Sequence, residues 1–549
     1  MWLDQADGFA EIFKGYLPYY LLVVFPIFII MSPANPVAAS HEFSVYRMQQ
    51  YDLHTVPHGC RSASFNLEGR SLTSWSMSRH CVVARIQDIT IDQFMEIRSK
   101  AGALLLVLPE NNTLLTDEEK EHIKLLEMAM MQQEISAPVY FAEWTPDFED
   151  IIKDLQHSFI TDDKSGTALE AMFNTVSSNG YQIVVSASTP QKVESKPVTL
   201  HGKLVGRSGT AQTIVIAAHY DASSIVPELS HGADSNASGA VAVLELARIF
   251  SRLYSTGSVR GGPALLFVLM STGHSLNYFA TKKWLEEQLD PSDATLLQDV
   301  SFVMCLDSVS SGPLTMHVSK PPKSGSPAQS IKSRLGAPLV HKKINLADEL
   351  LAWHHERFSI RRMTAFTLSS LQSHKDTSRN TVLDVPSEVS VRSLSKNIES
   401  TARALASHIY NLTDEENDED SALYDDALAV DEESIRHWYN FLSSQPRAPQ
   451  IITTTSPSGG ITGALERALS RYMEVTVSTH TVDKREPEYT LYSPTRAILY
   501  VYSVKPAVFD LILTLAIVAY LTLVYFAIQL FPRFYEEYAK IVTGKSKVN

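Results

Sequence analysis

The sequence contains only three cysteines in 549 residues, too few for a disulfide scaffold. A hydrophobic core must therefore hold the folded part together. Cys60 and Cys81 could form one bridge, whereas Cys305 lies inside an apolar segment, where we expect a free core thiol.

An excess of positive charge is also lacking. The formal net charge is −14, so composition gives no electrostatic case for nucleic-acid binding. Much of the acidity falls in residues 414–433, which lack the glycine turn and the alternating ligands of a calcium loop. We expect a solvated linker there. No internal repeat is found, and the length suits two or three domains.

Two apolar segments predict attachment to a membrane. Residues 511–531 carry no charge and have about the 20 residues that a helix needs to cross a bilayer. Basic residues follow, as in a short cytoplasmic tail. Residues 16–31 are apolar and are followed by small residues that suit signal-peptidase cleavage after Ala39. Because the start is acidic, an uncleaved anchor remains the alternative.

With either start, residues 40–506 are expected to face the lumen of a compartment or the outside. Sequons for N-glycosylation occur at Asn111, Asn236 and Asn411. Asn111 and Asn411 stand in polar turns and are candidate glycan acceptors. Asn236 lies within the candidate site, so we expect it to be buried.

Apolar segments alternate with helical patterns over most of the chain, which indicates an α/β fold. Strands are expected at residues 81–86, 103–108, 137–141, 182–188, 213–218, 264–271, 301–306 and 365–368. Helices are expected at residues 116–134, 153–179, 240–254, 276–288, 345–357, 393–410, 434–442 and 462–472.

This pattern predicts a division of the chain into seven parts. They are a signal peptide or signal anchor at 1–40, a small N-terminal α/β domain at 41–180, a larger α/β domain at 181–412, an acidic linker at 413–434, a helical juxtamembrane region at 435–506, a transmembrane helix at 507–532 and a cytoplasmic tail at 533–549.

Polar residues follow three buried strands at the point where each ends. His219 and Asp221 follow the strand at 213–218, residues 271–275 follow the strand at 264–271, and Asp307 follows the strand at 301–306. Asp234 stands in the loop before the next helix. Because open α/β sheets bind ligands at the carboxyl ends of their strands, we expect these side chains to converge.

The motifs HYD and GADSNASG resemble those of the M28 family of zinc aminopeptidases. The resemblance implies an M28-like mixed sheet flanked by helices, with His219 as a metal ligand and Asp221 as the residue that orients it. It also matches Asp234 to the carboxylate that bridges two metals and Asp307 to the next carboxylate.

The chain departs from the family at two places. Where the family has two glutamates, including the general base, this chain has residues 271–275, STGHS, and no Glu or Asp occurs between residues 261 and 284. His274 and Ser275 stand at the substituted positions. Asn380 replaces the family's last histidine ligand, and His374 upstream is expected to be a surface-loop residue. The sequence therefore predicts a vestigial peptidase site with no catalytic residue, no cofactor and no metal.

Long segments also resemble a nicastrin-like branch of this family from the endoplasmic reticulum. They are HEFSVYRMQQYDL, HYDASSIVPELSHGADSN, LLQDVSFVMCLDSV, HVSKPP, INLADELLAWHHERFSIRRM and VKPAVFDLIL. This resemblance implies a single-pass, non-catalytic scaffold whose bulk is lumenal. It further implies partners, namely Nodal modulator (NOMO) and a small multipass membrane protein, that assist multipass membrane protein insertion near the Sec translocon.

Two other functions remain open from the residues. One is a residual zinc hydrolase or aminopeptidase that uses His219, Asp234 and Asp307, with His274 or His374. The other is a lumenal receptor that keeps the old cleft to bind peptide amino termini.

Overall fold

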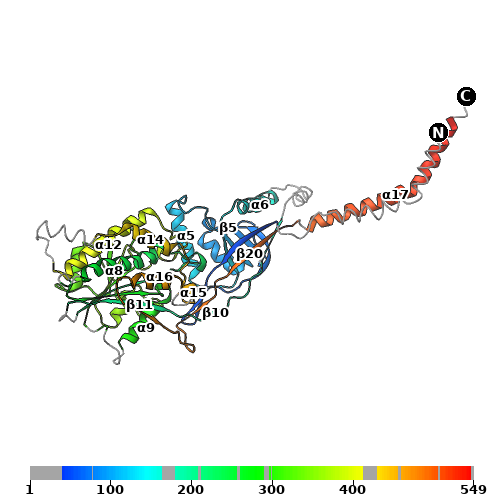
Figure 1. The fold of residues 1–549 in the computed structure, drawn as a ribbon. Coiled ribbons are helices and arrows are strands. Elements are labelled where there is room, and N and C mark those ends of the chain that lie inside the picture. The colour runs from blue at the N-terminus through cyan, green and yellow to red at the C-terminus, as the bar shows by residue number, and fades with distance from the viewer. Residues whose placement is uncertain are drawn as a thin grey trace.

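A computed structural model describes the chain in segments. These are residues 40–76, 78–163, 180–207, 212–255, 257, 260–289, 296–297, 299–411, 429–454, 459–504 and 507–545. The N-terminal apolar stretch at 16–31, the expected cleavage after Ala39, most of the acidic linker and residues 164–179 of the helix expected at 153–179 lie outside the described residues. Figure 1 shows two folded units followed by one long helix.

The smaller unit is a closed barrel with the strand order β1-β20-β9-β4-β5-β6-β8. Its strands are β1 (His41–Arg47), β4 (Phe65–Ser71), β5 (His80–Arg85), β6 (Ala103–Val107), β8 (Val139–Ala142), β9 (Gly180–Val185) and β20 (Arg496–Val504). Strands β5, β6 and β8 run parallel, and α4 (Ile91–Lys100) and α5 (Asp117–Met131) connect them. Both helices begin with a capping box, which satisfies their first backbone N–H groups.

The larger unit contains a mixed sheet in the order β16-β15-β17-β14-β12-β13-β11-β18. Its strands are β11 (Val198–Leu204), β12 (Thr213–His219), β13 (Ala264–Met270), β14 (Val300–Leu306), β15 (Thr315–Val318), β16 (Leu339–His341), β17 (Ala365–Ser369) and β18 (Val475–Thr479). The central strands β12, β13, β14 and β17 are parallel, so their carboxyl ends lie along one edge.

Helices cover both faces of this sheet, as the side chains of β12 require. Ile214 and Ile216 point into a core formed with α8 (Gly239–Ser255), α12 (Glu388–Ile409), α14 (Glu432–Ser443) and α16 (Gly460–Leu469). Val215 and Ala217 point to the other face, against α9 (Phe279–Gln288) and α11 (His355–Ile360). Because successive strand residues alternate between faces, a strand covered on both sides is apolar throughout.

A third sheet lies between the two units, in the order β10-β19-β2-β3-β7. It consists of β2 (Gln50–Leu53), β3 (Val56–Cys60), β7 (Glu134–Ile135), β10 (Lys192–Val193) and β19 (Tyr489–Tyr492). Distant parts of the chain therefore meet at the junction of the units.

The structure corrects the expected division of the chain after residue 434. Residues 435–506 do not form a separate helical juxtamembrane region. Helices α14 and α16 pack on the large sheet, β18 extends it, and β20 pairs antiparallel with both β1 and β9 in the barrel. The alternation of β20 explains its place, because Ala497, Leu499 and Val501 point into the barrel core.

A second correction concerns the helix expected at 345–357. Only its last three residues are helical, as the start of α11 (His355–Ile360). The Asn345 side chain accepts a hydrogen bond from Ala347 N (3.2 Å) and donates to Asp348 Oδ1 (2.7 Å). Such local side-chain bonds offer the backbone an alternative to a helix.

All three cysteines are free and buried, so Cys60 and Cys81 are not bridged. The Cys60 thiol contacts the carbonyl oxygen of Ala137 at 3.3 Å. The free core thiol expected at Cys305 is confirmed. Asn236 is buried, as expected, whereas Asn111 and Asn411 are exposed.

The chain ends in α17 (Ala507–Lys545), which extends away from the folded units (Figure 1). Residues Asp510–Phe531 are long and apolar enough to cross a membrane, and no other described helix meets this test. The helix expected at 511–531 is present, and it suggests a single-pass membrane protein.

Candidate functional site

The candidate site lies where the parallel strands of the large sheet end. His219 is the last residue of β12, residues 271–275 follow β13, and Asp307 follows β14. The parallel register brings these ends together, as the sequence predicts.

His219 is 4% exposed and lies between two carboxylates. Its Nδ1 is 3.0 Å from Oδ1 of Asp221, and its Nε2 is 3.7 Å from Oδ1 of Asp307. Burial alone would lower the pKa of His219, but the hydrogen bond to Asp221 and the negative charges of Asp221 and Asp307 raise it to about 9. We infer that the ring is protonated at neutral pH.

Gly273 closes the site from the β13 side. Its backbone N–H donates to Oδ2 of Asp221 (2.9 Å). A Cβ at this position would lie 2.5 Å from Nδ1 of His219, so a side chain does not fit. Residues 271–275 thus support the His219–Asp221 pair.

Ser271 and Thr272 stabilise the backbone near this point. Ser271 Oγ accepts a hydrogen bond from Val198 N (2.8 Å), and Thr272 Oγ1 accepts one from Ala280 N (2.7 Å). His274 lines a cavity, and burial and the nearby Arg379 lower its pKa well below the ordinary value. None of these groups is a carboxylate that could act as a general base.

Arg379 is the functional-site residue that sequence reasoning missed. It comes from a short helical turn, η6 (Thr377–Asn380), and is 3% exposed. Its Nη2 makes a charged hydrogen bond to Oδ2 of Asp307 and another to the Tyr278 hydroxyl (2.8 Å). Although burial would raise the pKa of Asp307, Arg379 and His219 hold it far below its usual range. Asp307 is therefore a carboxylate paired to two cations.

Asp234 is held by Ser310 rather than by His219. Its Oδ1 accepts hydrogen bonds from the backbone N–H (2.8 Å) and the hydroxyl (2.7 Å) of Ser310. The backbone N–H of Asp234 donates to the Asp384 carboxylate, with 2.9 Å between the nitrogen and Oδ1. Burial and the charge of Asp234 raise the pKa of Asp384.

Asn236 ties the strand ends together. Its Nδ2 donates to the carbonyl oxygens of His219 and Leu306, both at 3.0 Å. Its Oδ1 accepts hydrogen bonds from Gly239 N and Ser308 N, both at 3.0 Å. This residue fixes the distance between β12 and β14.

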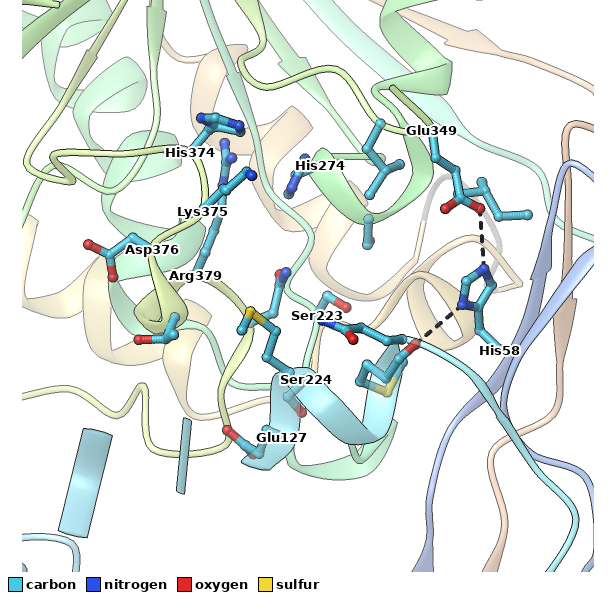
Figure 2. Close-up of a pocket in the computed structure, with 18 of the residues that line it drawn as sticks. His58, Glu127, Ser223, Ser224, His274, Glu349, His374, Lys375, Asp376 and Arg379 are labelled. Atoms are coloured by element: carbon cyan, nitrogen blue, oxygen red, sulfur yellow. Dashed lines mark hydrogen bonds and ion pairs between the residues drawn. The ribbon is translucent and has the colours of Figure 1, made fainter. Parts of the chain in front are cut away.

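A cavity of about 780 Å³ opens beside these residues, between the barrel unit and the large sheet. In Figure 2, His274, Lys375 and Arg379 lie at one side, and Glu127 of α5 lies at another. A third side carries His58, whose Nε2 is 3.3 Å from Oε1 of Glu349 (Figure 2).

Two residues that the sequence singled out also lie at this cavity. His374, in a turn and half-buried, and Asn380, which is exposed, both line the cavity. The structure places neither residue among the partners of His219 or Asp307 in the part of the chain that it describes.

These residues do not fit a pair of zinc ions. Such a site needs a carboxylate shared by both metals, together with further histidine and carboxylate ligands. Here Asp307 binds a guanidinium and Asp234 binds Ser310. Over the described segments, no three His, Cys, Asp or Glu side chains are placed to hold a metal ion. The fixed charge of Arg379 also opposes a divalent cation.

Comparison with known proteins bears on the family. Residues 199–343 match peptidase family M28. The BOS complex subunit NCLN of Homo sapiens is 39% identical over 550 residues, which cover 96% of each chain. The corresponding BOS complex subunit of Danio rerio is 39% identical over 571 residues, covering 98% of this chain and 99% of the relative. Nicalin of Caenorhabditis elegans is 30% identical over 515 residues, covering 88% of this chain and 89% of the relative.

A solved structure supports the fold. Nicastrin, a gamma-secretase component, matches with a TM-score of 0.56 at 11% identity, covering 84% of this chain and 100% of the nicastrin chain. At this identity the likeness concerns the fold alone. The M28-like fold expected from the sequence is confirmed.

Proposed function

Since the chain belongs to the nicalin family, we propose that it is a non-catalytic, peptidase-like subunit of a BOS-type complex in the membrane of the endoplasmic reticulum. Helix α17 anchors it, and the two folded units lie in the lumen. The identity of 39% over 96% of both chains supports the same assembly as in the relatives.

We further propose the partners that the resemblance implies. They are Nodal modulator and a small multipass membrane protein, and the complex works near the Sec translocon in multipass membrane protein insertion. The relatives' printed name as subunits of a complex supports an assembly role, and the apolar span Asp510–Phe531 supports action within a membrane.

One observation carries the non-catalytic part of the proposal: the Arg379 guanidinium binds Asp307, where the resemblance places a metal ligand. His219, Asp234 and Asp307 are then remnants of ligand positions, with Asp221 beside them. The absence of Glu and Asp from residues 261–284 removes the candidates for a general base, whose loss alone costs about 10²–10⁴ in rate.

A hydrolysis assay tests this proposal. Full-length protein, purified without chelators, is incubated with aminoacyl and dipeptide substrates with and without added zinc. We expect no turnover above that of a His219→Ala variant. Zinc-dependent turnover that Asp234→Ala abolishes would establish the residual aminopeptidase instead.

A pull-down tests the assembly role. The full chain should recover Nodal modulator and a multipass membrane protein, and His219→Ala should recover them equally. Deleting residues 511–531 should release the protein from the membrane and weaken its complex. Full assembly without the span would show that the folded units suffice.

The 780 Å³ cavity favours one second function, a lumenal receptor for peptides. Its volume lies within the usual range of ligand sites, and its charged residues suit a polar chain. Isothermal titration with short peptides that have free or acetylated amino termini tests this function. Saturable binding that Glu349→Gln weakens supports a receptor, because Glu349 lines the cavity with an exposed carboxylate, and no heat with any peptide argues against one.

A further inference from the structure

Both terminal nitrogens of Arg379 are held by groups of the large unit. Besides Asp307 and Tyr278, its Nη1 donates to the carbonyl oxygen of Ala352 (2.9 Å). Its guanidinium carbon lies 4.8 Å from the ring centroid of Trp353, which is 2% exposed. An arginine this deeply buried needs a carboxylate and further acceptors to offset its loss of water, and it has both.

The geometry around Arg379 retains the outline of a metal site. Nε2 of His219 has no hydrogen-bond partner among the described residues and lies 3.7 Å from Oδ1 of Asp307. Two ligands of one tetrahedral zinc, each about 2.0–2.1 Å from the metal, lie about 3.3 Å apart. His219 and Asp307 are therefore nearly at ligand separation, while the guanidinium supplies the positive charge that Asp307 requires.

The residues around Arg379 face the barrel unit. Thr377 Oγ1 donates to Oε1 of Glu121 (3.1 Å), and Lys124 Nζ donates to Ser378 Oγ (2.8 Å). Further on, Val382 N donates to Oε1 of Glu127 (3.1 Å). Glu121, Lys124 and Glu127 all belong to α5 of the barrel unit.

Apolar contacts strengthen the same connection. Val382 and Leu383 pack on the barrel-unit core that includes Ile123 and Leu126 of α5. Beyond them, Asp384 holds the backbone of Asp234 and Ser235 in the large unit. Residues 376–384 thus contact both units, the barrel unit through residues 377, 378, 382 and 383 and the large unit through residues 379 and 384.

We propose that Arg379 is the resident cation of a former metal site, and that its guanidinium makes residues 376–384 a metal-independent clasp between the barrel unit and the large sheet. The resemblance places a metal ligand of the family at the position of Asn380. In this chain the residue before it, Arg379, holds the strand ends with its guanidinium group instead. The partner-binding form of the protein then needs no zinc.

Metal analysis of the full-length protein in detergent tests the first half. We expect less than stoichiometric zinc after dialysis against micromolar zinc, and a thermal midpoint that a chelator leaves unchanged. Stoichiometric zinc that is lost in His219→Ala would overturn the proposal.

A double-mutant cycle tests the role of the cation. Arg379→Met should lower the thermal midpoint by roughly 5–15 °C, because it removes the guanidinium that binds the buried Asp307 carboxylate. Adding Asp307→Asn should restore a large part of that loss, since it removes the buried carboxylate that has lost its guanidinium partner. Arg403→Met, which removes an exposed arginine of α12, is the matched control and should shift the midpoint little.

Hydrogen exchange tests the clasp. In Arg379→Met, peptides from α5 and from residues 376–384 should exchange faster, while peptides from β5 and β6 keep wild-type rates. Unchanged exchange in α5 would refute the clasp. So would a double variant whose loss of stability equals the sum of the losses in Arg379→Met and Asp307→Asn. If Arg379→Met does not fold, Arg379→Lys keeps the charge and loses the paired donors, and an intermediate midpoint is expected.

Discussion

The carboxylate of Glu127, on α5 of the barrel unit, accepts a hydrogen bond from the backbone N–H of Val382 in the large unit at 3.1 Å. Glu127 is 1% exposed. Burial raises its pKa to about 7, although hydrogen bonds to Thr381 and Val382 oppose the rise. The junction of the two units therefore contains a carboxyl group that titrates near neutrality.

This relationship predicts a pH dependence of stability. The ordinary pKa of a glutamate is 4.5. Between pH 4.5 and about 7 the folded state keeps a proton that the unfolded state has lost, so the unfolding free energy falls as pH rises. The loss should reach about 3 kcal/mol at pH 8. Glu127→Gln keeps an acceptor for Val382 and removes the charge.

Thermal melts of wild type and Glu127→Gln at pH 5 and pH 8 measure the effect. The variant should gain stability at pH 8 and show a smaller difference in stability between the two pH values than wild type. Glu118→Gln, at an exposed position of α5, is the control and should follow wild type. An equal pH slope in wild type and Glu127→Gln would show that Glu127 does not titrate in this window.

Gly273 gives a second prediction, about packing. In Gly273→Ala the new Cβ would lie 2.5 Å from Nδ1 of His219 and 2.9 Å from Oδ1 of Asp221. The strand end must shift, and we expect a loss of about 1–3 kcal/mol in unfolding free energy. Denaturant melts of Gly273→Ala and Gly312→Ala measure it. A Cβ at Gly312 meets no atom within 4 Å, so that variant should be neutral.

The sequence predicted the central sheet and the convergence of its strand ends well. The reason is physical: a parallel strand covered on both faces, such as β12, must be apolar throughout, and its first polar residues mark the ligand edge. His219, Asp221 and Asp307 meet there. Distant pairing was harder to predict, because the apolar alternation of β20 does not specify that its neighbours are β1 and β9.

Arg379 escaped prediction because its role depends on position in space. Its sequence neighbours are those of a loop, and nothing local marks it for burial. Charge balance was the available signal. The buried carboxylates of Asp221 and Asp307 require a positive charge nearby, and Arg379 stands directly before Asn380.

A third prediction concerns the cysteines. Since all three are free and buried, an alkylating reagent should modify few thiols in the native protein. In denaturant without reductant, intact mass should increase by three adducts. An increase by one adduct would mean that Cys60 and Cys81 had formed a bridge. A Cys305→Ser variant, which should show two adducts, calibrates the count.

The last prediction concerns glycosylation, which reports on lumenal orientation. Asn111 is exposed, in a turn where its side chain accepts a hydrogen bond from Thr113 N (2.9 Å), and Asn411 is exposed at the end of α12. Asn236 is fully buried, and both groups of its amide are hydrogen-bonded to backbone. The transferase requires an accessible asparagine, so Asn111 and Asn411 should carry glycans. In cells, Asn111→Gln and Asn411→Gln should each remove one endoglycosidase-sensitive step on a gel, and the double variant should remove all. A step that persists in the double variant would place a glycan on Asn236, and a wild-type protein without steps would put the folded units on the other side of the membrane.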